Sequence, residues 1–352
     1  MKPEKPFYIA GSSAENPPSR CMVYVDGMGG DNFREGVDIE LSHWPSNRTL
    51  DQYKAGTSTE ICFKFLEDKN AAPYDLVVNN HIDIDGLLSV FVMAYSSIAM
   101  YHRDILCDAS KTGDFWAWSE GKALKIFQEV TLLYQRLQNQ DIPLKGIYEQ
   151  CFGLILHILD NPNEKSEAQT ILEEQTLLIE QGQIQRHEIS PRLVAYFVKD
   201  KEDRYFHMPR FNEPISTRLT FWPQVRNRLD AEKAQLVAIE TEHGTHYDLW
   251  YPGYVWADTK GLWRPPGLAL PKTPGEFQTL SWPELSVLMQ ALNDLEEKGC
   301  KWQVFPGLCF LRQDNPRDLP VVATTLASSH NHLSNLSLDK VMPLFKELFE
   351  KG

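Results

Sequence analysis

The feature that most constrains this chain is an apolar segment that changes abruptly into a polar one and back again. Residues 76–78 are Leu-Val-Val, residues 79–86 read Asn-Asn-His-Ile-Asp-Ile-Asp-Gly, and residues 87–95 are predominantly apolar. A short apolar run before a turn is typical of a buried strand, and the longer apolar run after it is typical of a helix. The order strand, polar turn, helix therefore predicts one unit of a layered α/β fold.

Three potential metal ligands stand at alternate positions in the polar turn: His81, Asp83 and Asp85. If the backbone stays extended through them, a period of two residues places all three on one side. One imidazole and two carboxylates suit a divalent cation such as Mn²⁺ or Mg²⁺. We therefore expect these residues to bind one or two such ions and to act as the catalytic residues. The alternative is a turn in which Asp83 or Asp85 only caps the following helix.

Further residues are candidates for completing such a site. Asp114 is the preferred additional metal ligand, because the Gly-Asp-Phe sequence at 113–115 closes the helical stretch that follows the motif. A simple helix-ending turn explains Asp114 equally well. Asp26, Asp108 and His330 are the other candidate ligands, since hydrolysis with two metal ions needs ligands around the second ion.

Four other residues, together with His330, are expected to bind the substrate. Gly86 and Ser89 lie at the start of the predicted helix, where exposed N–H groups and the helix dipole favour an anion such as phosphate. His43 and Arg48 lie in or beside the loop Ser-His-Trp-Pro-Ser-Asn at residues 42–47. Polar and aromatic loops of this kind line binding sites, and packing of the loop is the alternative explanation.

The sequence from His81 to Ser89 resembles the first motif of the DHH phosphoesterase superfamily, which includes single-strand exonucleases, oligonucleotide-degrading phosphodiesterases and manganese pyrophosphatases. The resemblance implies that His81, Asp83 and Asp85 bind a pair of metal ions that activate water for phosphoester hydrolysis. It covers residues 74–89 only. The Asp-His-His motif of the superfamily is absent, and the nearest sequence is Ser-His-Asn-His at residues 329–332. The superfamily's glycine-rich substrate motif is absent as well.

The chain also resembles an uncharacterised bacterial family of unknown function. This resemblance rests on the loop at 42–47, on Thr-Ser-Thr-Glu at 57–60, on the His-x-Asp-x-Asp-Gly segment and on Gly-Asp-Phe at 113–115. It covers much of the chain and implies no established activity.

A third pattern is that of the haloacid dehalogenases, in which Asp-x-Asp-Gly follows a strand. That resemblance implies a phosphatase with Asp83 as the nucleophile and Asp85 as the acid or base. Two features depart from the pattern: Leu87 stands where threonine is expected, and the residues before Asp83 are too polar.

We expect an α/β fold with a layered sheet and flanking helices in the N-terminal half, a helical middle, and a mixed α+β C-terminal half. The helical pattern ends near residue 182, and short alternating runs typical of strands follow. This change predicts an α/β domain with the metal site and a helical extension at 1–182, and an α+β domain at 183–352. Whether the second domain caps the site is left open.

Composition limits the partners and the location. The chain has 352 residues with 35 Lys+Arg and 48 Asp+Glu, which gives a net charge of −13. This balance argues against nucleic acid as the main partner, because neutralising phosphates takes clustered Lys and Arg. The longest apolar stretch is far shorter than a membrane span, and none of the cysteines forms Cys-x-x-Cys. We expect a cytoplasmic protein with a small anionic substrate and no membrane partner, and the sequence does not indicate an oligomeric state.

The leading hypothesis is a metal-dependent hydrolase of a small phosphoester or related anionic substrate, acting through metal-activated water. The alternative is a non-catalytic ligand-binding or partner protein on a DHH-like scaffold, which the missing Asp-His-His motif favours. The haloacid-dehalogenase-like phosphatase is the third hypothesis.

Overall fold

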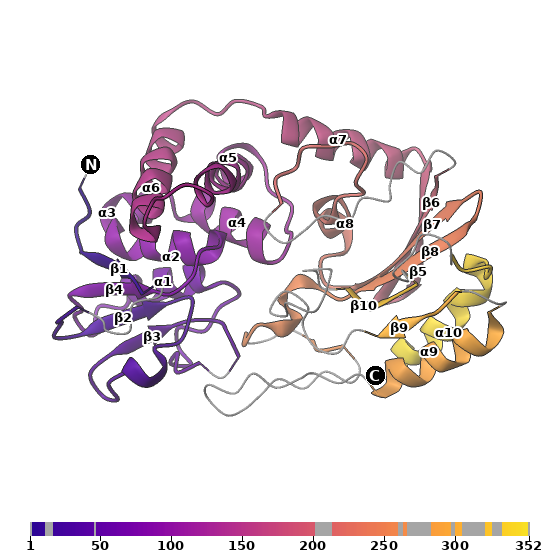
Figure 1. Ribbon diagram of the computed structural model, residues 1–352, viewed down its shortest axis with the longest axis horizontal. Coiled ribbons are helices and arrows are strands. Elements are labelled where there is room, and N and C mark those ends of the chain that lie inside the picture. The colour runs from indigo at the N-terminus through magenta and orange to yellow at the C-terminus, as the bar shows by residue number, and fades with distance from the viewer. Residues whose placement is uncertain are drawn as a thin grey trace.

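The computed structural model (Figure 1) describes most of the chain. The described residues are 2–10, 17–45, 47–200, 213–259, 263–265, 283–296, 300–304, 321–325 and 333–350. Each half contains one sheet, and helices lie between and around the two sheets. The mixed α/β organisation predicted from the sequence is confirmed, with a parallel N-terminal sheet, a helical middle and a mixed C-terminal sheet.

The N-terminal sheet is entirely parallel. Its strands lie in the order β1 (Phe7–Ile9), β4 (Leu76–Asn79), β2 (Met22–Val25) and β3 (Ile39–Leu41). The apolar run at residues 76–78 predicted β4. Strand β1 was not predicted, because three residues are too few to show a period, and its pairing with β4 is what defines it.

Helices of the N-terminal and middle segments pack on this sheet. Helix α1 begins at a capping box, in which Thr57 and Glu60 exchange hydrogen bonds with each other's backbone. The helical stretch after the motif is divided into three helices, α2 to α4. The bounds are α1 (Ser58–Glu67), α2 (Ile84–Ala94), α3 (Ser96–Tyr101), α4 (Arg103–Asp114), α5 (Gly121–Leu137), α6 (Leu144–Asp160) and α7 (Glu167–Glu180).

The C-terminal sheet is mixed. Its order is β5-β6-β7-β8-β10-β9, with β6 and β7 parallel and the other neighbours antiparallel. The strands are β5 (Ile184–Ser190), β6 (Leu193–Lys199), β7 (Ala234–Thr241), β8 (Gly244–Trp250), β9 (Gln303–Val304) and β10 (Val321–Thr324). The other elements are η1 (Gly30–Asn32), α8 (Pro223–Asp230), η2 (Gly253–Trp256), α9 (Pro283–Leu295) and α10 (Leu338–Glu350).

One apolar core extends through both halves. Phe63 of α1 and Phe91 of α2 belong to the same buried cluster as Tyr196 of β6 and Val237 of β7. A second cluster lies between the opposite face of the C-terminal sheet and helices α9 and α10. The boundary expected near residue 183 falls just before β5, and a division into two domains there stays a prediction.

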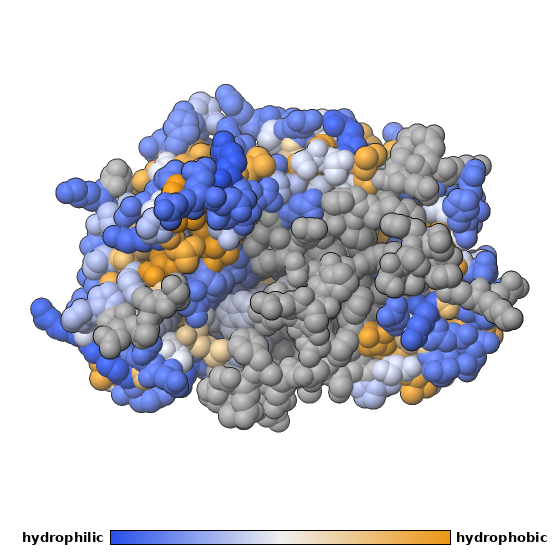
Figure 2. Space-filling view, in the orientation of Figure 1, coloured by the Kyte–Doolittle hydropathy of each residue, from blue (hydrophilic) through white to orange (hydrophobic). Residues whose placement is uncertain are grey.

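The described part of the face shown in Figure 2 is predominantly polar. Figure 2 shows hydrophilic side chains predominating on both halves of the face in view, with a smaller hydrophobic group on the left-hand half. None of the helices in the described residues combines the length and the apolar composition that crossing a membrane requires.

Candidate metal centre

Three neighbouring parallel strands deliver polar residues to one edge of the N-terminal sheet. Asp26 follows β2 directly, His43 follows β3 after one residue, and His81 follows β4 after one residue. The carboxyl ends of parallel strands are where open α/β sheets bind ligands. Asp26 has a left-handed backbone with φ 49°, a costly conformation for a residue other than glycine and one often found at functional sites.

Helix α2 begins inside the polar turn and divides its ligands. Strand β4 ends at Asn79 and α2 begins at Ile84, so the extended backbone does not continue to Asp85 and the alternating arrangement does not form. Asp83 is the N-cap of α2 and accepts a hydrogen bond from the Gly86 N–H at 2.7 Å. Asp85 lies in the first turn and is fully buried.

The acidic and histidine side chains form two groups that share one aspartate. Asp26, His43 and Asp85 form the inner group, and Asp26, His81 and Asp83 form the outer group. Within each group the potential ligand atoms lie within 4.8 Å of one another. Asp26 Oδ1 is 3.3 Å from His43 Nε2, and Asp26 Oδ2 is 3.1 Å from His81 Nε2. Asp26 therefore belongs to both groups, with one carboxylate oxygen toward each histidine.

Three carboxylates, the two of the inner group and that of the neighbouring Asp114, converge on one imidazole nitrogen. His43 Nε2 lies 3.3 Å from Asp26, 3.5 Å from Asp85 and 3.3 Å from Asp114. His43 Nδ1 is 2.7 Å from the carbonyl oxygen of Gly56. This contact assigns a proton to Nδ1, so that in the neutral ring the Nε2 lone pair points at three anionic groups. A cation is required between them, either a proton or a metal ion.

The pKa values of the inner group reflect this requirement. Burial lowers the pKa of His43, but hydrogen bonds with Asp114 and Asp26 outweigh it and raise that pKa well above the usual value. Burial and the charge of Asp26 raise the pKa of Asp85 to about 7. Burial and the charge of Asp85 raise the pKa of Asp114 well above its usual value. The raised pKa values of Asp85 and Asp114 therefore follow from burial and from the negative charge of neighbouring acids.

Three buried polar atoms of this cluster make no contact of full hydrogen-bond geometry within the described part of the chain: Asp26 Oδ2, His43 Nε2 and Asp114 Oδ1. The first two face other members of the cluster at 3.1–3.5 Å. An unpaired buried polar atom costs about 1–3 kcal/mol. Metal coordination would satisfy all three atoms, and carboxylate and imidazole ligands suit Mn²⁺. The residues present thus fit a divalent cation.

Helix α1 fixes the carboxylates of the inner group. The backbone N–H groups of Ser58 and Thr59 donate to the two oxygens of Asp85, at 2.7 and 2.9 Å. The Ser58 hydroxyl and the Trp44 indole donate to Asp26 Oδ1, at 2.8 and 3.2 Å. The capping box at Thr57 thus begins a helix whose first N–H groups orient a candidate ligand, a role that was not predicted from the sequence.

The outer group is more accessible. The side chain of His81 is 33% exposed, whereas that of His43 is fully buried. His81 Nε2 lies 3.0 Å from Asp83 Oδ2, and its Nδ1 lies 2.8 Å from Asn80 Oδ1. The Tyr148 hydroxyl donates to the His81 carbonyl at 2.6 Å. Burial lowers the pKa of His81, but the charge of Asp83 and hydrogen bonds with Asp26 and Asp83 outweigh it and raise that pKa well above its usual value.

The C-terminal half contributes a cover to the inner group. The ring of Trp256 in η2 lies 4.6 Å from that of His43 and 4.8 Å from that of Trp44, measured between centroids. The Asp258 N–H donates to the His43 carbonyl at 2.7 Å, and Lys54 Nζ donates to Asp258 Oδ2 at 2.7 Å. No signal in the sequence linked residues 256–258 to the motif.

Of the predicted substrate-binding residues, Gly86 lies beside the outer group and Ser89 lies in the interior. A Cβ at Gly86 would lie 2.8 Å from Asp26 Oδ2 and 3.0 Å from Asp83 Oδ1, so only glycine leaves the outer group open. Ser89 is buried, with its hydroxyl 3.3 Å from that of Thr59.

Two more predicted residues lie outside both groups, and one cannot be placed. Arg48 pairs with Glu35 at 2.7 Å and with Glu40 at 3.5 Å. Asp108 is exposed on α4. His330 falls outside the described residues.

The fold and the site define an α/β protein with a buried aspartate–histidine cluster at the carboxyl edge of a parallel sheet. A family model described as a family of unknown function (DUF6687) matches residues 6–202, more than half of the chain. The chain therefore belongs to this family, as expected from the resemblance to an uncharacterised family. Searches of curated proteins and of solved structures gave no significant match. The resemblance to the DHH phosphoesterases stays a prediction.

Proposed function

We propose that this protein is a metal-dependent hydrolase of phosphoesters that binds two divalent ions, Mn²⁺ in preference to Mg²⁺, in the inner and outer groups. The observation that best supports the proposal is Asp26, whose two oxygens face one histidine each, in a cluster with three buried polar atoms that make no contact of full hydrogen-bond geometry in the described part of the chain. Two imidazoles in the ligand set favour Mn²⁺ over Mg²⁺, which prefers oxygen ligands alone.

Divalent ions in this position supply a bound water of lowered pKa and stabilise the negative charge that develops on a phosphoryl group. The protein's own residues orient the ligands. The contact between His43 Nδ1 and the Gly56 carbonyl aims Nε2 into the inner group, and the Asn80 side chain does the same for His81. Hydrogen bonds of this kind fix the tautomer of a ligating histidine.

The exposure of the two groups and the charge of the chain also support the proposal. The partly exposed outer group admits a substrate, whereas the buried inner group does not. Bound cations would reverse the local sign of an acidic chain and attract an anionic substrate. The described cysteines, Cys21, Cys62, Cys107, Cys151 and Cys300, are free thiols, which supports the proposed cytoplasmic location.

The hypothesis of a non-catalytic protein has one specific observation in its favour. The inner group is sealed by Trp44 and Trp256, and a sealed ion stabilises a fold without catalysis. The haloacid-dehalogenase mechanism has less support, because Asp83 Oδ1 accepts a hydrogen bond from Gly86 and Asp83 Oδ2 faces His81. Both oxygens of the required nucleophile are thus engaged.

The test is a calorimetric titration of the metal-free full chain with Mn²⁺, followed by a screen of phosphomonoesters and phosphodiesters. We expect two ions per chain, hydrolysis that depends on them, and loss of both in Asp26→Asn. Asp108→Asn, which removes an exposed carboxylate from α4, is the matched control and should behave as the wild type. Metal binding unchanged by Asp26→Asn contradicts the site, and metal binding without hydrolysis of any ester contradicts the activity.

A further inference from the structure

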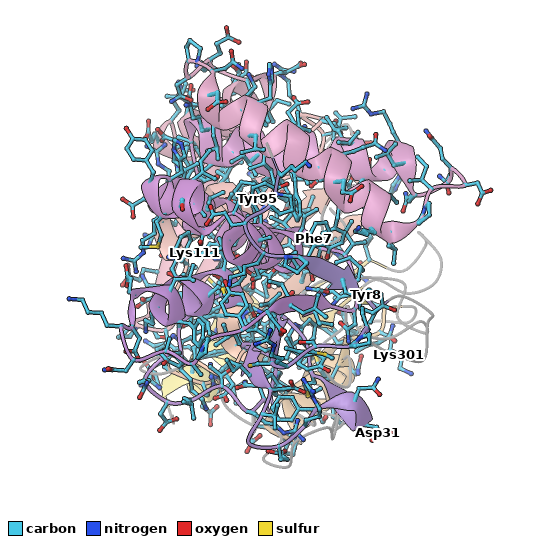
Figure 3. All side chains as sticks on the ribbon, turned by 90° about the vertical axis from the view of Figure 1, so that its left-hand side faces the viewer. Phe7, Tyr8, Asp31, Tyr95, Lys111 and Lys301 are labelled. Carbon is cyan, nitrogen blue, oxygen red and sulfur yellow. The ribbon has the colours of Figure 1, made fainter. Side chains whose placement is uncertain are left out.

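A cleft with a volume of about 330 Å³ lies beside the outer group. It is bounded by the ends of β1, β2 and β4 and by the glycine-rich segment that leads into η1. Its described lining consists of Ala10, Tyr24, Val25, residues 27–32 and residues 78–80. Figure 3 views the molecule from this end and labels Asp31 on η1. The volume is at the lower end of those found for small-molecule sites.

Asn80 connects this cleft to the outer group. Its Oδ1 lies 2.8 Å from His81 Nδ1, while its Nδ2 has no hydrogen-bond partner among the described residues. A Cβ at Gly27 would lie 2.8 Å from Asn80 Oδ1, so glycine at this position leaves the amide in place. The Asn80 amide thus has one atom that orients a candidate metal ligand and another that is able to donate to a molecule in the cleft.

The charge of the lining limits what the cleft can bind. Asp31 is the only charged residue in the described lining, and it is exposed. Beneath the glycine-rich segment, the Gly29 N–H donates to the buried carboxylate of Glu40 at 3.3 Å. No lysine or arginine belongs to the described lining. A second anionic group placed here would meet Asp31 as the one charged side chain of the described lining, whereas an uncharged polar group would not be repelled.

The lining suits a small molecule that has both an apolar side and polar groups. Tyr24, Val25 and Val78 supply the apolar part of the lining, and Asn80 supplies an exposed amide. Glycine at position 29 permits the close approach of Phe33, since a Cβ at Gly29 would lie 2.8 Å from Phe33 Cβ. Sugars combine hydroxyl groups with an apolar ring face in this way.

We propose that this cleft binds the uncharged, hydroxyl-bearing part of a phosphomonoester, such as the sugar of a sugar phosphate, while the phosphate lies at the outer group. The inference rests on the proposed function. In the reaction, water adds to phosphorus, the phosphorus–oxygen ester bond breaks, and the leaving alcohol takes up the proton that the water has lost. The products are the free sugar and inorganic phosphate.

The experiment compares two substrates of the Mn²⁺-loaded full chain, ribose 5-phosphate and inorganic pyrophosphate. We expect kcat/KM for ribose 5-phosphate to exceed that for pyrophosphate by about tenfold or more, since pyrophosphate would place its second phosphate against Asp31. Asp31→Lys is expected to raise kcat/KM for pyrophosphate and to narrow this difference.

A pair of glycine variants tests the contact with Asn80. Gly27→Ala displaces the Asn80 side chain, and we expect it to lower kcat/KM for ribose 5-phosphate by about tenfold, mainly through KM, with less effect on pyrophosphate. Gly153→Ala in α6 is the control, because a Cβ there meets no atom within 4 Å. Circular dichroism and bound Mn²⁺ show whether each variant is folded and loaded.

The outcomes separate the two proposals. Equal kcat/KM toward both substrates overturns the assignment of the cleft and leaves the hydrolase proposal standing. An equal loss of kcat/KM for both substrates in Gly27→Ala has the same meaning. Hydrolysis of pyrophosphate alone, an anhydride and not an ester, overturns both the assignment of the cleft and the phosphoester activity. If the Mn²⁺-loaded chain hydrolyses no phosphate compound, both proposals are wrong.

Discussion

Two groups of buried carboxylates, one in each half of this molecule, differ in their charged partners. In the C-terminal half, Asp230 accepts two hydrogen bonds from the Arg186 guanidinium, at 2.7 and 2.6 Å, and Lys233 lies 3.2 Å away. In the N-terminal cluster, no lysine or arginine of the described residues pairs with Asp26, Asp85 or Asp114, and the basic side chains beside them are histidines.

This difference distinguishes a structural acid from a functional one. Burial raises the pKa of Asp230, but hydrogen bonds with Arg186 and Tyr196 outweigh it and hold that pKa below its usual value. Asp85 and Asp114 have raised pKa values because burial and neighbouring acids are not offset. Perturbed acids in a cluster without basic partners are typical of functional sites, and the four predictions below test this contrast.

The largest effect is expected on metal affinity. Asp114→Asn removes a carboxylate next to His43 and should weaken Mn²⁺ binding to the inner group by about 100-fold. The metal-free variant should keep its stability within about 1 kcal/mol, because asparagine has nearly the size of aspartate and places no charge in the buried cluster. Calorimetry and urea unfolding measure the two quantities. Asp230→Asn is the counterpart, and a loss of Mn²⁺ affinity there would remove the contrast.

The second effect is expected on stability. Asp230→Asn leaves Arg186 without its partner and should lower the free energy of unfolding by about 2 kcal/mol. This value is smaller than that for a fully buried ion pair, because Arg186 is partly exposed. Urea unfolding of the metal-free protein measures it. The control is Asp51→Asn, at an exposed acid 3.7 Å from Lys54. Equal stabilities of Asp230→Asn and this control would contradict the structural role of Asp230.

The third effect concerns the rate of metal loss. Trp256→Ala opens the cover over His43 and should speed the removal of the inner ion by a chelator about tenfold, because escape no longer requires local opening of that cover. Stopped-flow mixing with a coloured chelator follows the release. Wild-type protein should show a fast phase from the outer group and a slow phase from the inner group. A variant with an unchanged slow phase would show that η2 does not limit release.

The smallest effect is expected on the pH dependence of stability. The pKa of Asp230 is lower in the folded protein than in the unfolded chain. At pH values between these two pKa values, the unfolded state therefore binds more protons than the folded state. The contribution of Asp230 is therefore complete above its unfolded pKa of about 4 and is lost below it. The difference in unfolding free energy between wild type and Asp230→Asn should thus shrink below about pH 4. A constant difference between pH 3 and pH 7 would contradict the assignment.

The sequence was informative about the site only where neighbouring residues form it. His81, Asp83 and Asp85 were recognised because they stand within five residues of each other, yet α2 begins between the last two and places them in different groups. His43 was expected to line the site, but its place beside Asp26 depends on the pairing of β2 with β3. Register between separate strands is not visible in local periodicity.

The fold was predicted better than the site, for a physical reason. Buried strands and amphipathic helices leave periodic patterns over many residues, as in α5 and α6, whereas three-residue β1 leaves none. The cover over His43 depends on its contact with Trp256, which lies more than 200 positions later in the sequence. Such contacts follow from the packing of the whole chain.

The shared apolar core has a practical consequence for the family as a whole. The matched segment ends at residue 202, but the core that contains Phe63 and Phe91 continues into Val237 and Ile239 of β7, and the cover over His43 comes from η2. A polypeptide ending at residue 202 would leave Tyr196 and its neighbours in contact with water, at about 25 cal/mol for each Å² of apolar surface. We expect such a fragment to aggregate, so the shared segment is not a self-sufficient folding unit in this protein.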